Sequence, residues 1–431
     1  MRSENVSLHI HQLMKSQRIL LLQGPMGNYF TQLARWLEFH NKQYYKVNFN
    51  GGDWFFSRGL NNLHYRGQLA EFEDWLVLHI KDKQIDVMVC FGDCRFYHRI
   101  AKRVSEELNI DFFVFEEGYV RPNYITFEHN GVNDFSDFKN FYDRSDQTIP
   151  DLPLPDHPQE VNPSFAFLIR SAICFYLMWV ICTFLYPHYR HHRMIRPSVE
   201  MFYWIRAGVR KLINKQVDSY KFLNLIQHHT DRYFTVALQV HNDSQVQVHS
   251  DYVDVRDFIH EVVISFAKEA DTSLHLVFKH HPMDRGYRHY GQLLRELASE
   301  YGLDGRVHYM CDVHLPTLMK HSLGIVTINS TTGIQALHHG KPVIALGRAI
   351  YNLPKLTFQG GLDQFWKNPG RVNRLHYRRF RYALVHYSQL NGAYYGQSPW
   401  MKNYDEKRLE NRFNYTVGGH TNKEKLRIVK D

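Results

Sequence analysis

Two imidazoles and an ammonium group come together at the end of a predicted strand, in the run Lys279-His280-His281-Pro282. An imidazole at the carboxyl edge of a parallel sheet can hydrogen-bond or neutralise a phosphate group that leaves during a transfer reaction. A single histidine is more often structural, but a His-His-Pro sequence directly at a strand end favours a functional role. We therefore predict a phosphate-binding site that includes Lys279, His281 and Pro282.

Hydroxyl side chains gather at the end of another predicted strand, in Asn329-Ser330-Thr331-Thr332-Gly333. A helix is predicted to follow, and the backbone N–H groups at a helix N-terminus attract phosphate. A helix cap needs only one Ser or Thr, whereas three precede this glycine. The pattern therefore predicts phosphate binding by Ser330, Thr331 and Thr332, and a plain helix cap is the alternative.

A pair of acids, Glu116-Glu117, ends a strand of the first half and is followed by Gly118 and Arg121. Because adjacent side chains on a strand point to opposite faces, only one of the two carboxylates is expected to reach the site. The other is expected to pair with a cation such as Arg121. Burial beside the aromatic run 112–115 would raise a carboxyl pKa towards that of a general base. The alternative is a pair of solvated loop acids.

A glycine turn between a strand and a helix carries Gly24, Gly27 and Asn28. It lacks the full dinucleotide fingerprint, so we expect it to line the acceptor side of the site. No Asp-x-Asp occurs in the chain, which disfavours a metal-bridged diphosphate and favours a monophosphate-linked donor with neither metal nor cofactor. Cys90 and Cys94 have no further ligands at zinc-site spacing, so structural zinc is not expected either.

Length and composition indicate a two-domain globular protein. The chain has 431 residues, of which 44% are hydrophobic and 22% charged, and one hydrophobic core rarely serves a chain of this length. The net charge of +9 favours anionic partners such as phospholipid or nucleotide sugars. No nucleic-acid recognition module is visible, so nucleic acid is not an expected partner. An odd number of scattered cysteines and an N-terminus without an apolar signal core predict a cytoplasmic protein.

The elements that position these motifs alternate as strand and helix in both halves of the chain. The predicted strands are 18–23, 45–49, 85–91 and 111–115, and then 234–240, 274–279, 307–309, 324–328 and 342–345. Strands that end in glycine, acids or imidazoles indicate parallel sheets with sites at their carboxyl ends. The predicted fold is α/β, with two doubly wound Rossmann-like domains. The predicted divisions are an acceptor-side domain 1–150, a linker and helical region 151–230, a donor-side domain 231–365, and a basic tail 366–431 that packs back across the domains.

The most apolar run covers residues 171–186 and is followed by a basic cluster at 188–193. It is shorter than the roughly 20 residues that span a bilayer. We therefore predict a buried or interfacial helix and peripheral association with an anionic membrane, helped by Arg190, Arg193 and the basic stretch 371–381. A helix that merely bridges the two domains is the alternative.

Taken in chain order, these motifs resemble the KpsS/LipB-type capsule β-Kdo transferases, which are related to the KpsC enzymes of Gram-negative group 2 capsules. The resemblance covers most of the chain. It rests on the motifs Leu22-Gln23-Gly24-Pro25-x-Gly27, Phe115-Glu116-Glu117-Gly118-Tyr119-x-Arg121-Pro122, Leu238-Gln239-Val240-x-x-Asp243-Ser244-Gln245, Lys279-His280-His281-Pro282 and Asn329-Ser330-Thr331-x-Gly333.

The resemblance implies a GT-B fold whose two domains face an interdomain cleft. It also implies CMP-β-Kdo as donor and a phosphatidylglycerol or lysophosphatidylglycerol acceptor, on which the first Kdo of the capsule linker is placed. The expected location is the inner face of the inner membrane, alongside other capsule synthesis and export proteins. The alternative is a non-catalytic assembly or export factor that keeps the fold.

The resemblance also implies roles for single residues. His281 matches the His-Pro motif of CMP-sugar transferases, and Glu117 matches their acid before glycine. The donor site would further include Gln239, Asp243, Ser244 and Gln245, with Ser330 and Thr331 on the CMP phosphate. Relatives often carry Glu-Asp-Gly-Phe-x-Arg-Ser, whereas this chain has Glu117 and Pro122 at two of these positions. The longer side chain of Glu leaves open whether Glu117 is the nucleophile or the base.

Overall fold

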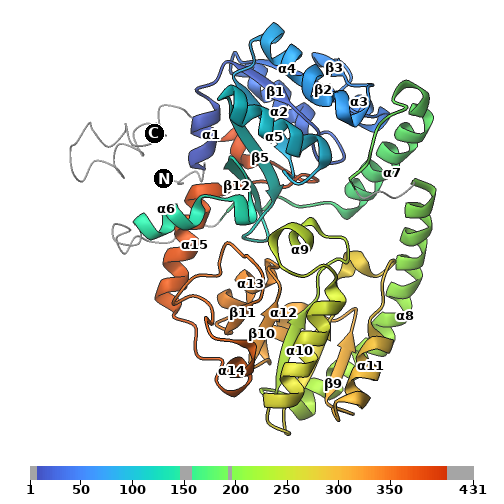
Figure 1. The fold of residues 1–431 in the computed structure, drawn as a ribbon, viewed down its shortest axis with the longest axis vertical. Coiled ribbons are helices and arrows are strands. Elements are labelled where there is room, and N and C mark those ends of the chain that lie inside the picture. The colour runs from blue at the N-terminus through green and yellow to red at the C-terminus, as the bar shows by residue number, and fades with distance from the viewer. Residues whose placement is uncertain (1–6, 146–157, 193–196, 405–431) are drawn as a thin grey trace.

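The computed structural model describes residues 7–145, 158–192 and 197–404. They form two α/β domains stacked along the long axis of the molecule (Figure 1). Each domain has its own sheet, with parallel strands at its centre and helices on both faces. The predicted fold class, GT-B-like with two Rossmann-like domains, is confirmed.

The N-terminal sheet has seven strands in the order β12-β6-β5-β4-β1-β2-β3. Strands β1 to β5 pair in parallel, whereas β6 pairs antiparallel with both β5 and β12. The central strands β1 and β4 are continuous apolar runs because helices cover both of their faces. The strands are β1 (Arg18–Leu21), β2 (Gln43–Asn48), β3 (Asn62–His64), β4 (Val87–Phe91), β5 (Asp111–Glu117), β6 (Tyr124–His129) and β12 (Gln389–Asn391).

The C-terminal sheet has five strands, all parallel, in the order β11-β10-β7-β8-β9. Its three central strands are therefore β10, β7 and β8, whose carboxyl ends carry three of the sequence motifs. The strands are β7 (Tyr233–Ala237), β8 (His275–Lys279), β9 (Val307–Met310), β10 (Gly324–Thr327) and β11 (Val343–Ala345).

The helices of the N-terminal half cover its sheet and then lead down one side of the molecule (Figure 1). The longest helix of the described chain is α8, with 33 residues. The helices of this half are α1 (Leu8–Leu13), α2 (Tyr29–Phe39), α3 (Gly51–Phe56), α4 (Phe72–Lys83), α5 (Phe96–Leu108), α6 (Phe138–Ser145), α7 (Phe165–Ile181) and α8 (Pro197–His229).

The helices of the C-terminal half cover the second sheet, and the chain then returns to the first domain. Helix α15 contacts α6, α1 and β6, and β12 joins the N-terminal sheet. The helices are α9 (Ser244–His249), α10 (Val255–Glu269), α11 (Gly291–Glu300), α12 (Leu315–Lys320), α13 (Thr332–His338), α14 (Leu362–Lys367), α15 (Arg374–Ser388) and α16 (Pro399–Lys402).

The apolar run 171–186 forms most of α7 and the short 3-10 turn η3 (Thr183–Leu185). Among the described residues, no helix is both long and apolar enough to cross a membrane. Figure 1 places α15, which holds most of the basic stretch 371–381, on the opposite side of the molecule from α7 and α8. The two regions therefore do not share one face. Arg193 lies outside the described residues.

Candidate active site

His281 follows β8 and is held in one orientation by the turn that it starts. It is the N-cap of the short 3-10 turn η4 (Pro282–Asp284), and its Nδ1 accepts a hydrogen bond of 3.2 Å from the Met283 N–H. The imidazole proton of the neutral ring must then sit on Nε2. Burial lowers the pKa of His281 to about 4, and the positive charge of Lys279 acts in the same direction. At neutral pH the ring is therefore an uncharged hydrogen-bond donor.

The two residues before His281 hold the sheet edge together. Lys279 is buried, and its Nζ donates to the main-chain oxygens of His280 (2.8 Å) and Cys311 (2.7 Å). Burial lowers the pKa of Lys279 to about 8. His280 is also buried and shares a 2.9 Å hydrogen bond with the Tyr309 hydroxyl. The Lys279 ammonium group thus links the ends of β8 and β9 and stabilises the segment that carries His281.

Gln239 and Asn329 bind each other across the ends of β7 and β10. The Gln239 side-chain N–H donates to Asn329 Oδ1 at 2.9 Å, and the Asn329 main-chain N–H donates to Gln239 Oε1 at 3.1 Å. Asn329 also donates to the main-chain oxygen of His249 at 3.0 Å. Both side chains are buried. Gln239 was predicted as a donor-site residue, and its hydrogen bonds make it a residue that positions the Ser330 turn.

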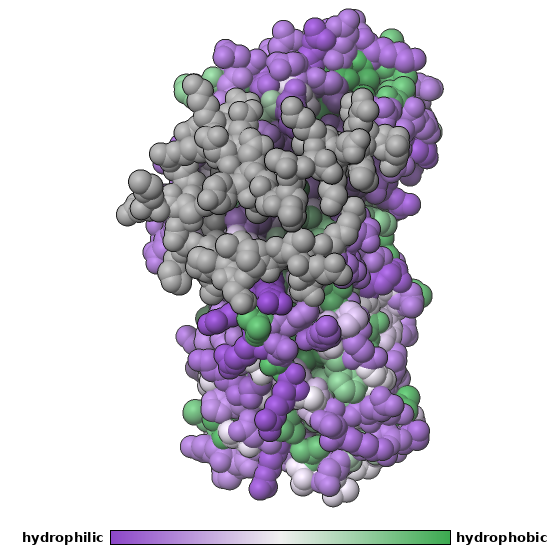
Figure 2. Space-filling view, turned by 90° about the vertical axis from the view of Figure 1, so that its left-hand side faces the viewer, coloured by the Kyte–Doolittle hydropathy of each residue, from purple (hydrophilic) through white to green (hydrophobic). Residues whose placement is uncertain are grey.

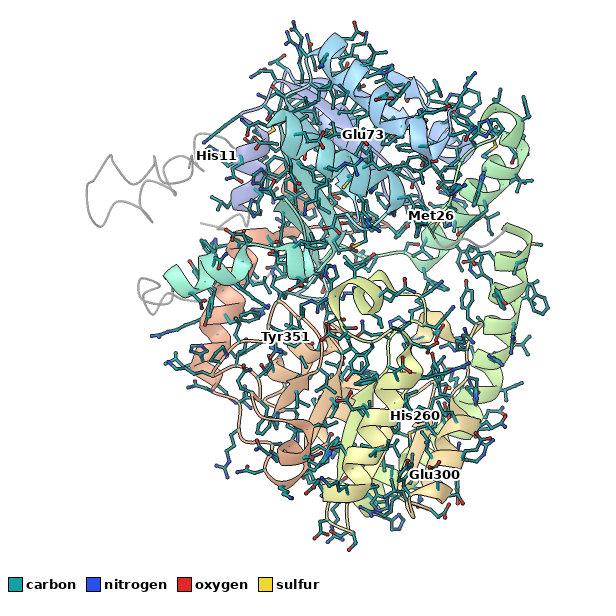
Figure 3. All side chains as sticks on the ribbon, viewed as in Figure 1. His11, Met26, Glu73, His260, Glu300 and Tyr351 are labelled. Carbon is teal, nitrogen blue, oxygen red and sulfur yellow. The ribbon has the colours of Figure 1, made fainter. Side chains whose placement is uncertain are left out.

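The hydroxyl-rich turn after β10 is ordered by its own side chains. The Ser330 hydroxyl accepts from the Thr332 N–H at 3.2 Å and contacts the Thr332 hydroxyl at 3.1 Å, while Thr331 is the N-cap of α13 without a side-chain capping bond. The Tyr351 hydroxyl donates to the Ser330 main-chain oxygen at 2.6 Å. Figure 3 shows Tyr351 in the part of the C-terminal domain nearest the N-terminal domain. Because β7 separates β10 from β8 in the sheet, the Ser330 turn after β10 and His281 after β8 lie at the same edge, one strand apart.

The remaining motif of this edge begins α9. Asp243 is half-buried, and its main-chain oxygen accepts from the N–H groups of Val246 and Gln247. The side chains of Ser244 and Gln245, which were predicted to bind the donor, lie outside the described part of the structure.

The two acids at the end of β5 have different surroundings. Glu116 is half-buried, and its Oε1 accepts from the Glu117 N–H at 2.9 Å. Burial raises the pKa of the Glu116 carboxyl to about 8, and the charges of Glu117 and Asp93 add to the rise. Glu117 is exposed and pairs with Arg121, with an Oε2 to Nη2 distance of 3.8 Å. Glu116 thus has the environment of an acid or base, and Glu117 that of a solvated carboxylate beside a cation.

Gly118 sets the path of the chain after the acid pair. A Cβ at this position would lie 2.0 Å from the Tyr124 main-chain oxygen, so no side chain fits. The residues that follow, Tyr119 and Val120, are buried in an apolar cluster with residues of α13 and α15. The acid pair is therefore carried into the boundary between the two domains.

The glycine turn of the N-terminal domain is anchored by buried charges. Gln23 donates to both carboxylate oxygens of Asp53 (3.2 and 2.9 Å) and accepts from Arg95 Nη1 at 3.0 Å, and Arg95 also donates to the Gly24 oxygen at 3.3 Å. A Cβ on Gly92 would lie 3.6 Å from Glu116 Oε2 and 3.7 Å from Arg95 Nε. Arg95 therefore lies between the glycine turn and the acid pair.

Gly27 and Asn28 complete this turn. Gly27 has φ +118° and packs beside the Ser171 side chain of α7, and Asn28 precedes α2 as its N-cap. Figure 3 shows Met26 at the end of the N-terminal domain that faces the C-terminal domain.

Two contacts join the two domains near the carboxyl ends of their sheets. Cys94 Sγ lies 3.8 Å from His249 Nε2. Arg348 binds Asp134 of the N-terminal domain and Asp251 of the C-terminal domain, both at 2.8 Å. The positive charge of Arg121 also contributes to the lowered pKa of His281. The two domains are therefore in contact at Cys94 and Asp134, and the charge of Arg121 acts on His281.

Several of these residues were not predicted. Arg95 follows a Gly-Asp strand end, which is a local signal, but its hydrogen-bond partners Gln23 and Gly24 lie more than 70 positions away. Asn329 begins the hydroxyl-rich motif that ends at Gly333, but its hydrogen-bond partner Gln239 is 90 positions away. Nothing local marks His249 or Arg348. In the part of the chain that the structure describes, no cluster of three or more His, Cys, Asp or Glu side chains is arranged as a metal site.

Comparison with known proteins identifies the family. A family model described as "Capsule polysaccharide biosynthesis protein" matches residues 86–395. The chain belongs to this capsule polysaccharide biosynthesis family. It is 42% identical to the capsule polysaccharide export protein KpsS of Escherichia coli over 386 residues, which cover 89% of this chain and 98% of the relative. It is 37% identical to the capsule polysaccharide modification protein LipB of Neisseria meningitidis serogroup A, over 89% of this chain and 93% of that protein.

Among solved structures, this capsule-family chain is similar to KpsC of Thermosulfurimonas dismutans, described as a β-Kdo 2,7 transferase. The two are 13% identical with a TM-score of 0.39, over 84% of this chain and 98% of the other. The family resemblance expected from the sequence motifs is thus confirmed by the family model and the two sequence relatives.

The raised pKa of Glu116 predicts that the stability of this capsule-family protein depends on pH. The carboxyl has an ordinary pKa near 4.5 and a folded pKa of about 8. Unfolding therefore releases a proton between these values and becomes easier as pH rises. Glu116→Gln, which cannot ionise, should be more stable than the wild type at pH 8 by on the order of 1–3 kcal/mol.

Urea denaturation at pH 4 and pH 8 measures this difference, which should nearly vanish at the lower pH. Glu300→Gln is the matched control, because Glu300 is exposed at the end of α11 and Figure 3 shows it far from the domain boundary. A Glu116→Gln variant that is no more stable than the wild type at pH 8 contradicts the burial effect.

Proposed function

We propose that this protein transfers Kdo from CMP-β-Kdo to a phosphatidylglycerol or lysophosphatidylglycerol acceptor and so starts the linker of a capsule polysaccharide. The observation that carries the proposal is the position of His281 and the Ser330 turn at one sheet edge, together with the charge of Arg121, the partner of Glu117 in the other domain, that acts on His281. A neutral imidazole N–H and hydroxyl groups stabilise a leaving monophosphate, and a carboxylate opposite them acts as nucleophile or base. Membership of the capsule family supports the biosynthetic setting.

The choice of donor rests on the motifs. The His281-Pro282 pair and the acid before Gly118 resemble those of CMP-sugar transferases. The hydrogen bond from the Met283 N–H to His281 Nδ1 supports this role, since it leaves the Nε2 proton to donate to a phosphate oxygen. The Gln239–Asn329 pair would act indirectly by holding the Ser330 turn at the donor phosphate.

We also propose a peripheral position on the cytoplasmic face of the inner membrane, with other capsule synthesis and export proteins as partners. A lipid acceptor requires the active site to lie at a membrane surface. The family assignment supports work alongside other capsule proteins.

The decisive experiment incubates the purified full-length protein with CMP-Kdo and a fluorescent phosphatidylglycerol analogue. Mass spectrometry of the lipid should show an increment of one Kdo, and CMP-sialic acid, offered as a control donor, should give no product. The second candidate is a non-catalytic role, which the description of the Escherichia coli relative as an export protein favours. A non-catalytic role predicts that the lipid stays unchanged in the presence of the donor. That result would overturn the proposal.

We predict that transfer survives EDTA, with a rate within about twofold of the untreated enzyme. A donor joined through a single phosphate leaves with less charge than a diphosphate, so hydrogen bonds from His281 and Ser330 would take the place that a metal holds in other transferases. The measurement is the initial rate before and after chelation and dialysis. Loss of activity that magnesium or manganese restores would contradict the prediction.

A further inference from the structure

Exposed apolar side chains gather on two neighbouring helices. Scattered exposed apolar residues are ordinary, but a contiguous patch marks an interaction surface. Most of the large apolar side chains that are exposed in the described residues lie on α7, η3 and α8: Phe165, Ile169, Ile173, Leu177, Val180, Ile181, Phe184, Val199, Met201, Phe202, Ile205, Val209, Leu212, Ile213, Val217, Tyr220 and Leu223. We name this set the α7–α8 apolar face.

The two helices meet through aromatic side chains. The rings of Tyr176 in α7 and Trp204 in α8 are in contact, with centroids 5.5 Å apart. Along α8 the exposed apolar residues recur every three or four positions, which aligns them in a stripe on one side of the helix. With 33 residues, α8 extends for about 50 Å. Figure 1 shows α7 and α8 in succession along the same side of both domains.

The charges on these helices have one sign at the surface. The sequence of α7 contains no acid, and the acids of α8, Glu200 and Asp218, are buried. Asp218 is used internally, where it accepts from the N–H groups of Cys311 (2.7 Å) and Asp312 (2.8 Å). The basic residues that are exposed on α8 are Lys211, Lys215 and Lys221. The apolar stripe is therefore flanked by positive charge with no exposed negative charge on either helix.

Each helix is built directly onto one half of the active site. Helix α7 packs its inner side on α3 and on the glycine turn, where Gly27 lies beside Ser171. Helix α8 packs on the loop that follows His281-Pro282. A Cβ on Gly286 would lie 2.2 Å from the Tyr203 main-chain oxygen, and Arg210 donates to the Arg285 main-chain oxygen at 2.8 Å.

We propose that the α7–α8 apolar face lies in the surface of an anionic lipid bilayer and holds the acceptor turn and the donor loop on the membrane side of the molecule. An apolar stripe with flanking lysines has the composition of an interfacial helix, and cations next to it attract anionic headgroups. A second copy of the same face would bring like charges together, which disfavours a symmetric dimer. Figure 2 shows that the opposite side, where not grey, is largely hydrophilic with its apolar residues scattered.

The test is flotation of the full-length protein with vesicles, which needs no enzymatic activity. Binding should be strong to vesicles that contain phosphatidylglycerol and weak to neutral phosphatidylcholine vesicles, and high salt should weaken it. Ile205→Ser/Leu212→Ser removes two side chains that are 63% and 73% exposed, and Lys211→Glu/Lys215→Glu reverses two charges. Each double variant should bind at least about tenfold more weakly.

The matched control is Leu78→Ser/Val253→Ser, which removes two equally exposed apolar side chains from other helices and loops, 64% and 83% exposed. It should float like the wild type, and all variants should keep their thermal unfolding midpoint because the replaced side chains are exposed. Variants of the α7–α8 apolar face that float normally overturn the proposal. So does a dimer in sedimentation analysis that the same substitutions dissociate, because that result assigns the face to a second copy.

Only the link to catalysis rests on the proposed function. The membrane variants should lose transfer to phosphatidylglycerol in vesicles by about tenfold or more, yet keep transfer to a short-chain, water-soluble acceptor. If the wild type never transfers Kdo but the variants lose flotation, the proposed function is wrong and the docking surface is still supported. Equal loss with the soluble acceptor would show that the substitutions damage the site, and would overturn the link between docking and catalysis.

Discussion

Replacing His281 with alanine is expected to lower kcat for Kdo transfer by at least about 100-fold, the typical cost of losing one donor to a developing negative charge. The Nε2 proton is available because Nδ1 is engaged with the Met283 N–H, and the ring is neutral at pH 7 because burial lowers its pKa to about 4. The effect should fall on kcat because the phosphate oxygen gains charge as CMP leaves.

The measurement is steady-state transfer with saturating CMP-Kdo, accompanied by thermal unfolding. His281→Gln keeps an N–H donor and should recover part of the rate. His260→Ala is the matched control, since His260 is exposed on α10 and Figure 3 shows it away from the boundary between the domains. Retention of more than about a tenth of the wild-type rate in His281→Ala contradicts the assignment.

Replacing Glu117 is expected to have the second large effect, a loss of about 1,000-fold or more in both Glu117→Ala and Glu117→Gln. A β-linked product from a β-linked donor requires retention, and two successive displacements achieve it. In the first, a Glu117 carboxylate oxygen bonds to the anomeric carbon while the bond to the phosphate oxygen breaks and CMP leaves with its electron pair. In the second, the acceptor hydroxyl oxygen replaces Glu117 and passes its proton to a base.

The structure separates the two acids in a way that suits these steps. Glu117 is exposed and paired with Arg121, whereas Glu116 is half-buried with a pKa of about 8. Glu116 is thus the better candidate for the base, and the rate of the acceptor step should rise with pH up to about 8. Glu116→Gln should flatten this rise, while Glu117 variants should leave no active enzyme to titrate.

Intact-protein mass spectrometry of the wild type with donor alone checks the nucleophile directly. A single Kdo adduct should form, and peptide digestion should map it to Glu117. An adduct on Glu116 would exchange the roles of the two acids, and an α-linked product by NMR would rule out retention. Glu300→Gln should behave as the wild type in every assay.

Much of the fold was predictable because short local sequence patterns specify its strands. The parallel strands of both domains are short apolar runs that end in glycine or polar residues, and the structure reproduces nearly all of them with small changes at their ends. Strands β3, β6 and β12 were not predicted. Strand β12 is only three residues long, Gln389–Asn391, and it exists because β6 pairs with it from more than 260 positions away. Such a pairing has no periodic signal in the sequence.

The α7–α8 apolar face was predicted only in part. The apolar run 171–186 is visible as composition, but the stripe on α8 is interrupted by basic and polar residues in the sequence. Which side of α8 is exposed depends on the buried carboxylate of Asp218, which binds the end of β9. The basic stretch 371–381 was expected to share the membrane face, and the return of α15 to the N-terminal domain carries it to the other side of the molecule.

The sequence by itself determined the chemical groups and their places at strand ends: the His-Pro pair after β8, the hydroxyls after β10, the acids after β5 and the glycine turn after β1. Only the tertiary structure decided how each group is used. Lys279 was expected at a phosphate, and its ammonium binds two carbonyl oxygens; Gln239 was expected at the donor, and it binds Asn329. The two acids, adjacent in sequence, differ in burial and therefore in pKa. Residue type and strand ends are local properties, whereas hydrogen-bond partners and desolvation depend on segments that meet only when the chain folds.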